Sequence, residues 1–130
     1  MAEFGGKVKP TILYLDDEVM LLNLFREIFS DEYEVETAST IAEARRLLSE
    51  CRPEVIISDW SMPEISGVDF LREAASACPE AFRILLTGFA HAGEMIEEIR
   101  TGVIQLFIPK PWNEAEMHEA LERALLLRSR

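Results

Sequence analysis

Five polar residues stand at or just after the ends of apolar runs in the sequence, where their side chains could act together. They are Asp16, Asp17, Asp59, Thr87 and Lys110. Three carboxylates that meet at one point would repel each other, and a hard divalent cation such as Mg²⁺ relieves that repulsion by taking oxygen ligands. A carboxylate held beside such a cation is a candidate nucleophile towards a phosphoryl donor. A lysine and a threonine could then bind the oxygens of the transferred group.

These side chains can meet only if the apolar runs are parallel strands that end at one edge of a sheet. Most of the runs are nearly continuous in aliphatic residues, which is typical of strands covered on both faces. The second run alternates charged residues with Val and Thr and so favours an edge position. The predicted strands are Thr11–Leu15, Tyr33–Ala38, Glu54–Ser58, Phe82–Leu86 and Ile104–Ile108.

Stretches with apolar residues at helical spacing separate the runs and continue after the last one. The apolar stripes are Leu22/Phe25/Ile28/Phe29, Ile41/Ala44/Leu47/Leu48, Val68/Leu71/Ala74/Ala75, Met95/Ile96/Ile99 and Met117/Leu121/Ala124/Leu125. Helix-start signals agree, since Thr40 with Glu43, Ser66 with Asp69 and Asn113 with Glu116 have capping-box spacing. Strand and helix therefore alternate five times. This order predicts an α/β fold with a doubly wound, five-stranded parallel sheet of the flavodoxin-like kind, which binds ligands at the carboxyl ends of its strands.

Length and composition restrict the possible functions. The 130 residues suit one domain, which we expect over residues 11–130, with residues 1–10 as a flexible lead-in. The net charge of −11 disfavours direct binding to nucleic acid or to anionic lipid. The sequence holds neither an apolar run long enough to span a membrane nor a signal peptide, so we expect a cytoplasmic protein with Cys51 and Cys78 reduced.

The chain resembles the receiver domain of bacterial two-component response regulators over Thr11 to Leu127. No single motif is specific, but the set in this order is. The matching motifs are Leu15-Asp16-Asp17-Glu18, Asp59 with Met62-Pro63 and Gly67, Thr87-Gly88, and Lys110-Pro111.

This resemblance implies a metal site and a phosphoacceptor. Asp16 and Asp17 would position Mg²⁺ or Mn²⁺, and Asp59 would be both the phosphorylated residue and a metal ligand. The backbone carbonyl of Ser61 would be a further ligand.

The same resemblance implies a switch. Thr87 would move towards the phosphoryl group, Lys110 would contact its oxygen, and the aromatic ring of Phe107 would report activation. The Lys110–Pro111 peptide bond is expected to be cis, as is usual in the family.

The implied function is regulatory rather than metabolic. A sensor histidine kinase or a phosphotransfer protein would phosphorylate Asp59, and the face made by the fourth helix, fifth strand and fifth helix would rearrange or form a homodimer. The segment Arg83–Trp112, which contains the motifs Leu85–Phe89 and Lys110–Trp112, resembles receivers attached to HD-GYP phosphodiesterases or to transcriptional activators. An output domain missing from this chain is therefore expected.

Other interpretations of the same residues remain open. A receiver-fold interaction module that is never phosphorylated would keep the fold. An aspartyl-nucleophile phosphohydrolase would instead need an Asp-x-Asp pair after the first strand and an additional cap, whereas Asp16 and Asp17 are adjacent. Taken singly, Asp17 fits a helix N-cap, Thr87 a turn, and Phe107 or Trp112 a packing residue.

Overall fold

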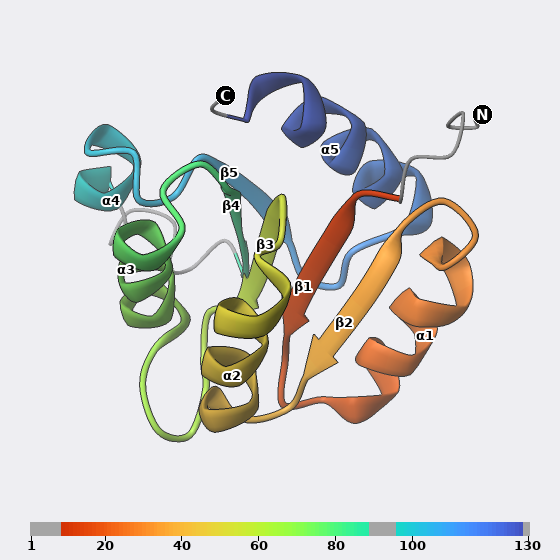
Figure 1. Ribbon diagram of the computed structural model, residues 1–130, viewed down its shortest axis with the longest axis horizontal. Helices are drawn as coiled ribbons and strands as arrows, with labels where there is room; N and C mark the ends of the chain where they lie inside the picture. Colours follow the sequence, from red (N-terminus) through yellow and green to blue (C-terminus); the bar gives the residue numbers. More distant parts are fainter. Residues whose placement is uncertain (1–8, 89–95, 129–130) are drawn as a thin grey trace.

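The alternation predicted from the sequence is present in the computed structural model of the chain, which describes residues 9–88 and 96–128. Five parallel strands form one sheet in the order β2-β1-β3-β4-β5, so the edge position predicted for the second strand is confirmed. The elements are β1 (Thr11–Leu15), α1 (Val19–Phe29), β2 (Glu34–Ala38), α2 (Ile41–Cys51), β3 (Val55–Asp59), α3 (Gly67–Ala77), β4 (Phe82–Thr87), α4 (Ile96–Arg100), β5 (Leu106–Pro109) and α5 (Glu114–Leu127) (Figure 1).

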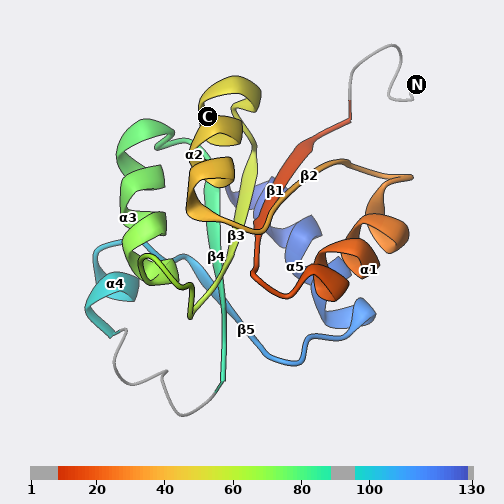
Figure 2. The same cartoon turned by 90° about the horizontal axis from the view of Figure 1, so that it is seen from below.

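Helices cover both faces of the sheet, as a doubly wound fold requires. Seen from below, α2 and α3 lie on one side of the strands and α1 and α5 on the other (Figure 2). Two separate cores result. One packs Leu13 and Ile56 against α2 and α3, and the other packs Tyr14 and Ile57 against α1 and α5. Side chains of neighbouring strand positions therefore alternate between the two cores.

The three capping signals are confirmed. The side chains of Thr40, Ser66 and Asn113 each accept a hydrogen bond from the backbone N–H three residues later, at the starts of α2, α3 and α5. Each cap satisfies one backbone N–H that the helix itself leaves without a partner. These helices therefore begin where the sequence predicted.

Several predicted strand bounds are shifted. β3 both begins and ends one residue later than predicted, and β4 extends by one residue, so the two strands include Asp59 and Thr87 themselves. β2 begins one residue late, because the N–H of Tyr33 bonds to the carbonyl of Phe29 at the end of α1. β5 begins at Leu106, two residues later than predicted, because the N–H of Ile104 bonds to the α4 carbonyl of Glu98.

The stripe predicted for the fourth helix is not a buried face. Met95 lies outside the described residues, while Ile96 and Ile99 on α4 are 62% and 44% exposed. One contact of α4 with the rest of the fold is polar, since Arg72 of α3 forms an ion pair of 2.6 Å with Glu98.

Arg83 holds the segment between α4 and β5, a role that its sequence context gave no reason to expect. Its guanidinium is buried and donates to the carbonyls of Ala81, Gly102 and Val103 at 2.8 to 3.0 Å. Burial lowers the pKa of this guanidinium. This set of hydrogen bonds, the Arg83 clamp, fixes where β5 starts. It thereby positions the strand that ends beside Lys110.

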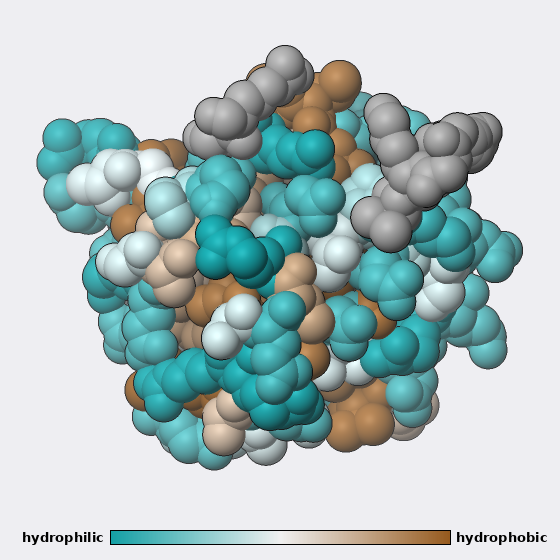
Figure 3. Space-filling view, viewed as in Figure 1, coloured by the Kyte–Doolittle hydropathy of each residue, from teal (hydrophilic) through white to brown (hydrophobic). Residues whose placement is uncertain are grey.

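The visible surface is mostly polar. The face seen in Figure 3 is largely hydrophilic, with hydrophobic residues in separate patches. Among the described helices, none is both long enough and apolar enough to pass through a bilayer.

Candidate functional site

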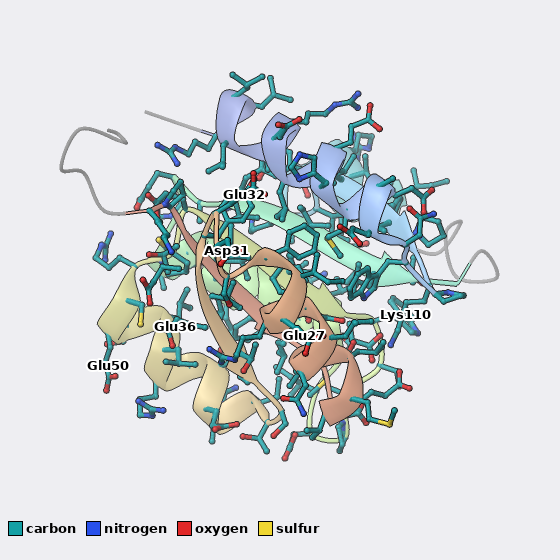
Figure 4. The ribbon with its side chains drawn as sticks, turned by 90° about the vertical axis from the view of Figure 1, so that its right-hand side faces the viewer. Glu27, Asp31, Glu32, Glu36, Glu50 and Lys110 are labelled. Carbon is teal, nitrogen blue, oxygen red and sulfur yellow. The ribbon has the colours of Figure 1, made fainter. Side chains whose placement is uncertain are left out.

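The register of the sheet brings the sequence-predicted residues to one edge. Leu15 pairs with Ser58, so Asp16, which follows β1, and Asp59, the last residue of β3, come side by side. Further along the sheet, Thr87 pairs with Pro109, which places Lys110 just beyond. Figure 4 shows Lys110 at the end of the sheet towards which the strands point. This edge is where parallel α/β sheets bind ligands.

Three carboxylates form the centre of the site. Oxygen atoms of Asp16, Asp17 and Asp59 all lie within 4.8 Å of one another. Asp16 is fully buried and Asp59 is 6% exposed, while Asp17 is exposed. Asp17 is not a helix cap, since the N-cap of α1 is Glu18, whose side chain makes no capping bond. Two buried carboxylates and one exposed one, all oxygen donors, fit a hard divalent cation entering from solvent.

Lys110 supplies the positive charge at this site in the described residues. Its ammonium lies 3.1 Å from Asp59, 3.3 Å from Asp16 and 2.9 Å from Glu18. Burial alone would lower the pKa of Lys110, but hydrogen bonds to Glu18 and Asp59 outweigh burial and raise it, so the ammonium stays charged. One ammonium faces four carboxylates, counting Asp17, and the excess negative charge is what a divalent cation would neutralise.

Burial, and next the charge of Asp16, raise the pKa of Asp59 above its ordinary 3.8, although Lys110 opposes this shift. The ionised carboxylate is therefore held in an unfavourable environment. Such perturbed groups are characteristic of functional sites.

Asp16 is held by donors on both of its oxygens. The backbone N–H of Glu18 donates to Oδ1 at 3.0 Å, and the hydroxyl of Tyr14 donates to Oδ2 at 2.7 Å. Burial, and then the charge of Asp16, raise the pKa of Tyr14, so its hydroxyl remains protonated and a donor. Tyr14 was not predicted as a site residue, because an aromatic residue inside a strand is typical of a hydrophobic core.

The structure does not bring every predicted residue into contact with Asp59. The Thr87 hydroxyl, on the neighbouring strand, donates to the carbonyl of Gly88 at 3.1 Å. Phe107 is partly buried and packs against the α2/α3 core. Ser61 lies exposed in the loop two residues beyond Asp59. The Lys110–Pro111 bond is cis, as predicted.

Gly67 is the first residue of α3, at the end of the loop that follows Asp59. Its N–H bonds to the carbonyl of Trp60, and a Cβ at this position would lie 1.9 Å from the carbonyl oxygen of Asp59. We expect Gly67→Ala to lower the free energy of unfolding by about 2 kcal/mol, measured by urea denaturation, because backbone must move. Gly88→Ala is the control, since its Cβ would meet nothing within 4 Å. Equal stability of Gly67→Ala and wild type would contradict this close contact.

The raised pKa of Asp59 predicts that Asp59→Asn increases the free energy of unfolding by an amount that depends on pH. A raised folded pKa means that Asp59 contributes stability below its ordinary pKa and loses that contribution as pH rises through the folded pKa. The metal-free Asn variant should therefore be more stable than wild type at neutral pH, and the gain should shrink on acidification. Denaturation of both proteins across pH, with the exposed Asp31→Asn as control, measures this. A less stable Asp59→Asn at neutral pH would contradict it.

Comparisons with known proteins agree with this site. A sequence profile of the response regulator receiver domain matches residues 12–122. The chain is 32% identical over 117 residues to the hydrogenase transcriptional regulatory protein HoxA of Cupriavidus necator, a match that covers 90% of this chain but only 24% of HoxA. It is 29% identical over 115 residues to the chemotaxis protein CheY of Listeria monocytogenes, covering 87% of this chain and 96% of CheY.

A solved structure supports the same relationship. The signal receiver domain of an HD domain-containing protein from Pseudomonas fluorescens superposes with a TM-score of 0.83 at 28% identity. The superposition covers 92% of this chain and 89% of that one.

Proposed function

This chain belongs to the response regulator receiver domains of two-component signal transduction, and from that premise we propose that Asp59 is its phosphoacceptor. The observation that supports this choice is the position of Asp59, which lies nearly buried between the acidic neighbour Asp16 and the ammonium of Lys110. Asp17, by contrast, is exposed. Of the two buried carboxylates, Asp59 lies closer to the ammonium that a transferred phosphoryl group would need, at 3.1 Å against 3.3 Å for Asp16.

The transfer step follows from these contacts. A carboxylate oxygen of Asp59 attacks the phosphorus of a phosphohistidine on a histidine kinase or phosphotransfer protein. The new O–P bond forms as the P–N bond breaks, and the electron pair of that bond returns to the imidazole nitrogen. Lys110 already lies 3.1 Å from Asp59 and would bind an oxygen of the arriving group.

Asp16, Asp17, Asp59 and the backbone carbonyl of Ser61 would hold Mg²⁺ or Mn²⁺. When bound, the cation neutralises charge on the transferred phosphoryl oxygens. Lys110 and the Tyr14 hydroxyl keep Asp16 oriented towards the same point.

The switch would begin at Thr87 and Phe107. The Thr87 hydroxyl gives up its bond to the Gly88 carbonyl and donates to a phosphoryl oxygen. Phe107 then repacks, and the groove between β5 and α5, lined by Leu106, Phe107, Glu116 and Arg123 among others, changes shape. A partner, or a second copy of this chain, that binds one shape of the groove better would shift the population of the domain towards that shape.

The partner downstream is proposed from the relatives. HoxA is about four times as long as the match, and the Pseudomonas receiver is part of an HD domain-containing protein. We infer that this domain likewise controls an attached output domain, either one that regulates transcription or an HD domain. We do not expect it to catalyse a metabolic reaction itself.

Phosphorylation is tested by intact mass after incubation with acetyl phosphate and Mg²⁺. We expect a gain of one phosphoryl group that disappears in Asp59→Asn and in the presence of a chelator. Asp31→Asn, an exposed aspartate away from the site, should gain the group like wild type. A folded, Mg²⁺-binding protein that gains no mass would instead support the interaction module that is never phosphorylated.

A further inference from the structure

A chain of hydrogen bonds leads from the acidic site to the start of α5. The indole N–H of Trp112 lies 3.2 Å from the hydroxyl of Tyr14, and that hydroxyl lies 2.7 Å from Oδ2 of Asp16. Tyr14 and Asp16 are both fully buried. Trp112 directly precedes Asn113, the N-cap of α5.

The direction of these bonds is fixed by their chemistry. An indole nitrogen can only donate, and an ionised carboxylate can only accept. Trp112 therefore donates to Tyr14, and Tyr14 donates its one proton to Asp16. A buried hydroxyl polarised in this way makes a stronger bond than an isolated one, because each bond in a chain strengthens the next.

Aromatic packing fixes the positions of the Tyr14 and Trp112 rings relative to each other. The ring of Phe25 on α1 makes an edge contact with Tyr14, with centroids 5.0 Å apart, and another with Trp112 at 6.0 Å. Phe29 packs on Trp112 from the same helix. Trp112 is thus held over Tyr14 by α1, and a shift of the Tyr14 hydroxyl must be met by a shift of the indole or by loss of their bond.

We infer that Tyr14 and Trp112 are positioning residues with two roles. They hold Asp16 in place for its metal, and they transmit a change in metal occupancy of the acidic site to the first turn of α5. This route is separate from the one through Thr87 and Phe107, because it crosses the opposite core, between the sheet and α1 and α5. The inference rests on the proposed metal binding. Because coupling is reciprocal, the metal must change the surroundings of Trp112, and loss of the Trp112 bond must change the affinity for the metal.

The first half of the test is spectroscopic. The chain has two tryptophans, so Trp60→Phe leaves Trp112 as the sole indole. Titration of this protein with Mg²⁺ should change the Trp112 emission, with the midpoint that calorimetry gives for Mg²⁺ binding. Adding Tyr14→Phe should abolish the emission change while calorimetry still detects binding.

The second half is a double-mutant cycle on the Mg²⁺ dissociation constant. We expect Tyr14→Phe to weaken binding about tenfold, as loss of a partner of a metal ligand commonly does. Trp112→Phe, which keeps an aromatic ring, should weaken binding less, and should add nothing in the Tyr14→Phe background. Tyr33→Phe is the control, since it removes the hydroxyl of another buried tyrosine, which precedes β2 at the opposite end of the sheet from the site, and should leave the dissociation constant unchanged.

Four results would overturn the inference. Mg²⁺ binding without any change in Trp112 emission, or with an unaltered change after Tyr14→Phe, would show that Trp112 does not sense the site. Additive effects of Tyr14→Phe and Trp112→Phe would show that they act independently. Calorimetry that detects no Mg²⁺ binding to the parent protein would overturn the proposed metal site as well.

Discussion

Replacing Asp16 with asparagine should weaken Mg²⁺ binding and slow phosphoryl transfer to Asp59 by at least about 100-fold. Asp16 is the fully buried carboxylate of the cluster, and both of its oxygens are already held by donors. The amide retains one oxygen for the Tyr14 hydroxyl, but it loses the charge that attracts a divalent cation. Calorimetry with Mg²⁺ and the rate of mass gain from acetyl phosphate measure the two effects.

The variant should remain folded. Asp16→Asn removes one of the mutually repelling carboxylates, but its amide nitrogen cannot accept the hydrogen bond from the Glu18 N–H, so urea denaturation is used to show that the metal-free protein still unfolds cooperatively. Asp31→Asn makes the same chemical change on the exposed surface, where Figure 4 shows Asp31 away from Lys110. This control should alter neither the affinity for Mg²⁺ nor the rate of phosphoryl transfer. An Asp16→Asn protein that binds Mg²⁺ with wild-type affinity would remove Asp16 from the metal site.

Replacing Lys110 with methionine should destabilise the metal-free protein by about 2 kcal/mol, the usual contribution of a hydrogen bond to a charged group. The ammonium bonds to Asp16 and Asp59, which would otherwise be buried without a cation. Since Mg²⁺ neutralises the same carboxylates, saturating Mg²⁺ should stabilise Lys110→Met more than it stabilises wild type. Urea denaturation with and without Mg²⁺ gives both differences.

Arg45→Met provides the comparison. Arg45 also makes two hydrogen bonds to a carboxylate, that of Glu73, but both side chains are about half exposed. Solvent screens such a pair, so its loss should cost much less and should not respond to Mg²⁺. If Mg²⁺ stabilised Lys110→Met no more than wild type, the cation and Lys110 would not share the same carboxylates.

The acidic site was predictable because it depends on strand order and not on side-chain detail. Parallel strands end at one edge, so Asp16 and Asp59 had to meet once the runs before them were recognised as neighbouring strands. The helix starts at Thr40 and Ser66 were predictable for a similar reason, since a capping bond spans only three residues. Local rules of this kind can be read from the sequence alone.

What the sequence could not predict depends on packing between distant segments. Tyr14 and Trp112 are 98 residues apart, and only the docking of α5 on the sheet joins them. The Arg83 clamp also needs the folded α4–β5 segment to supply its carbonyls. The short α4 has too few residues for a periodic stripe to be diagnostic, and its isoleucines are exposed.

The most direct measurement of the central claim is the location of the phosphoryl group in the chain. Borohydride reduces an aspartyl phosphate to an alcohol, so reduction after treatment with acetyl phosphate and Mg²⁺ leaves a stable mass change at the modified residue. Tandem mass spectrometry of the digested protein then identifies that residue. The account predicts the change at Asp59 alone, absent when Mg²⁺ is withheld. A change at Asp16 or Asp17, or one that persists in Asp59→Asn, would contradict it.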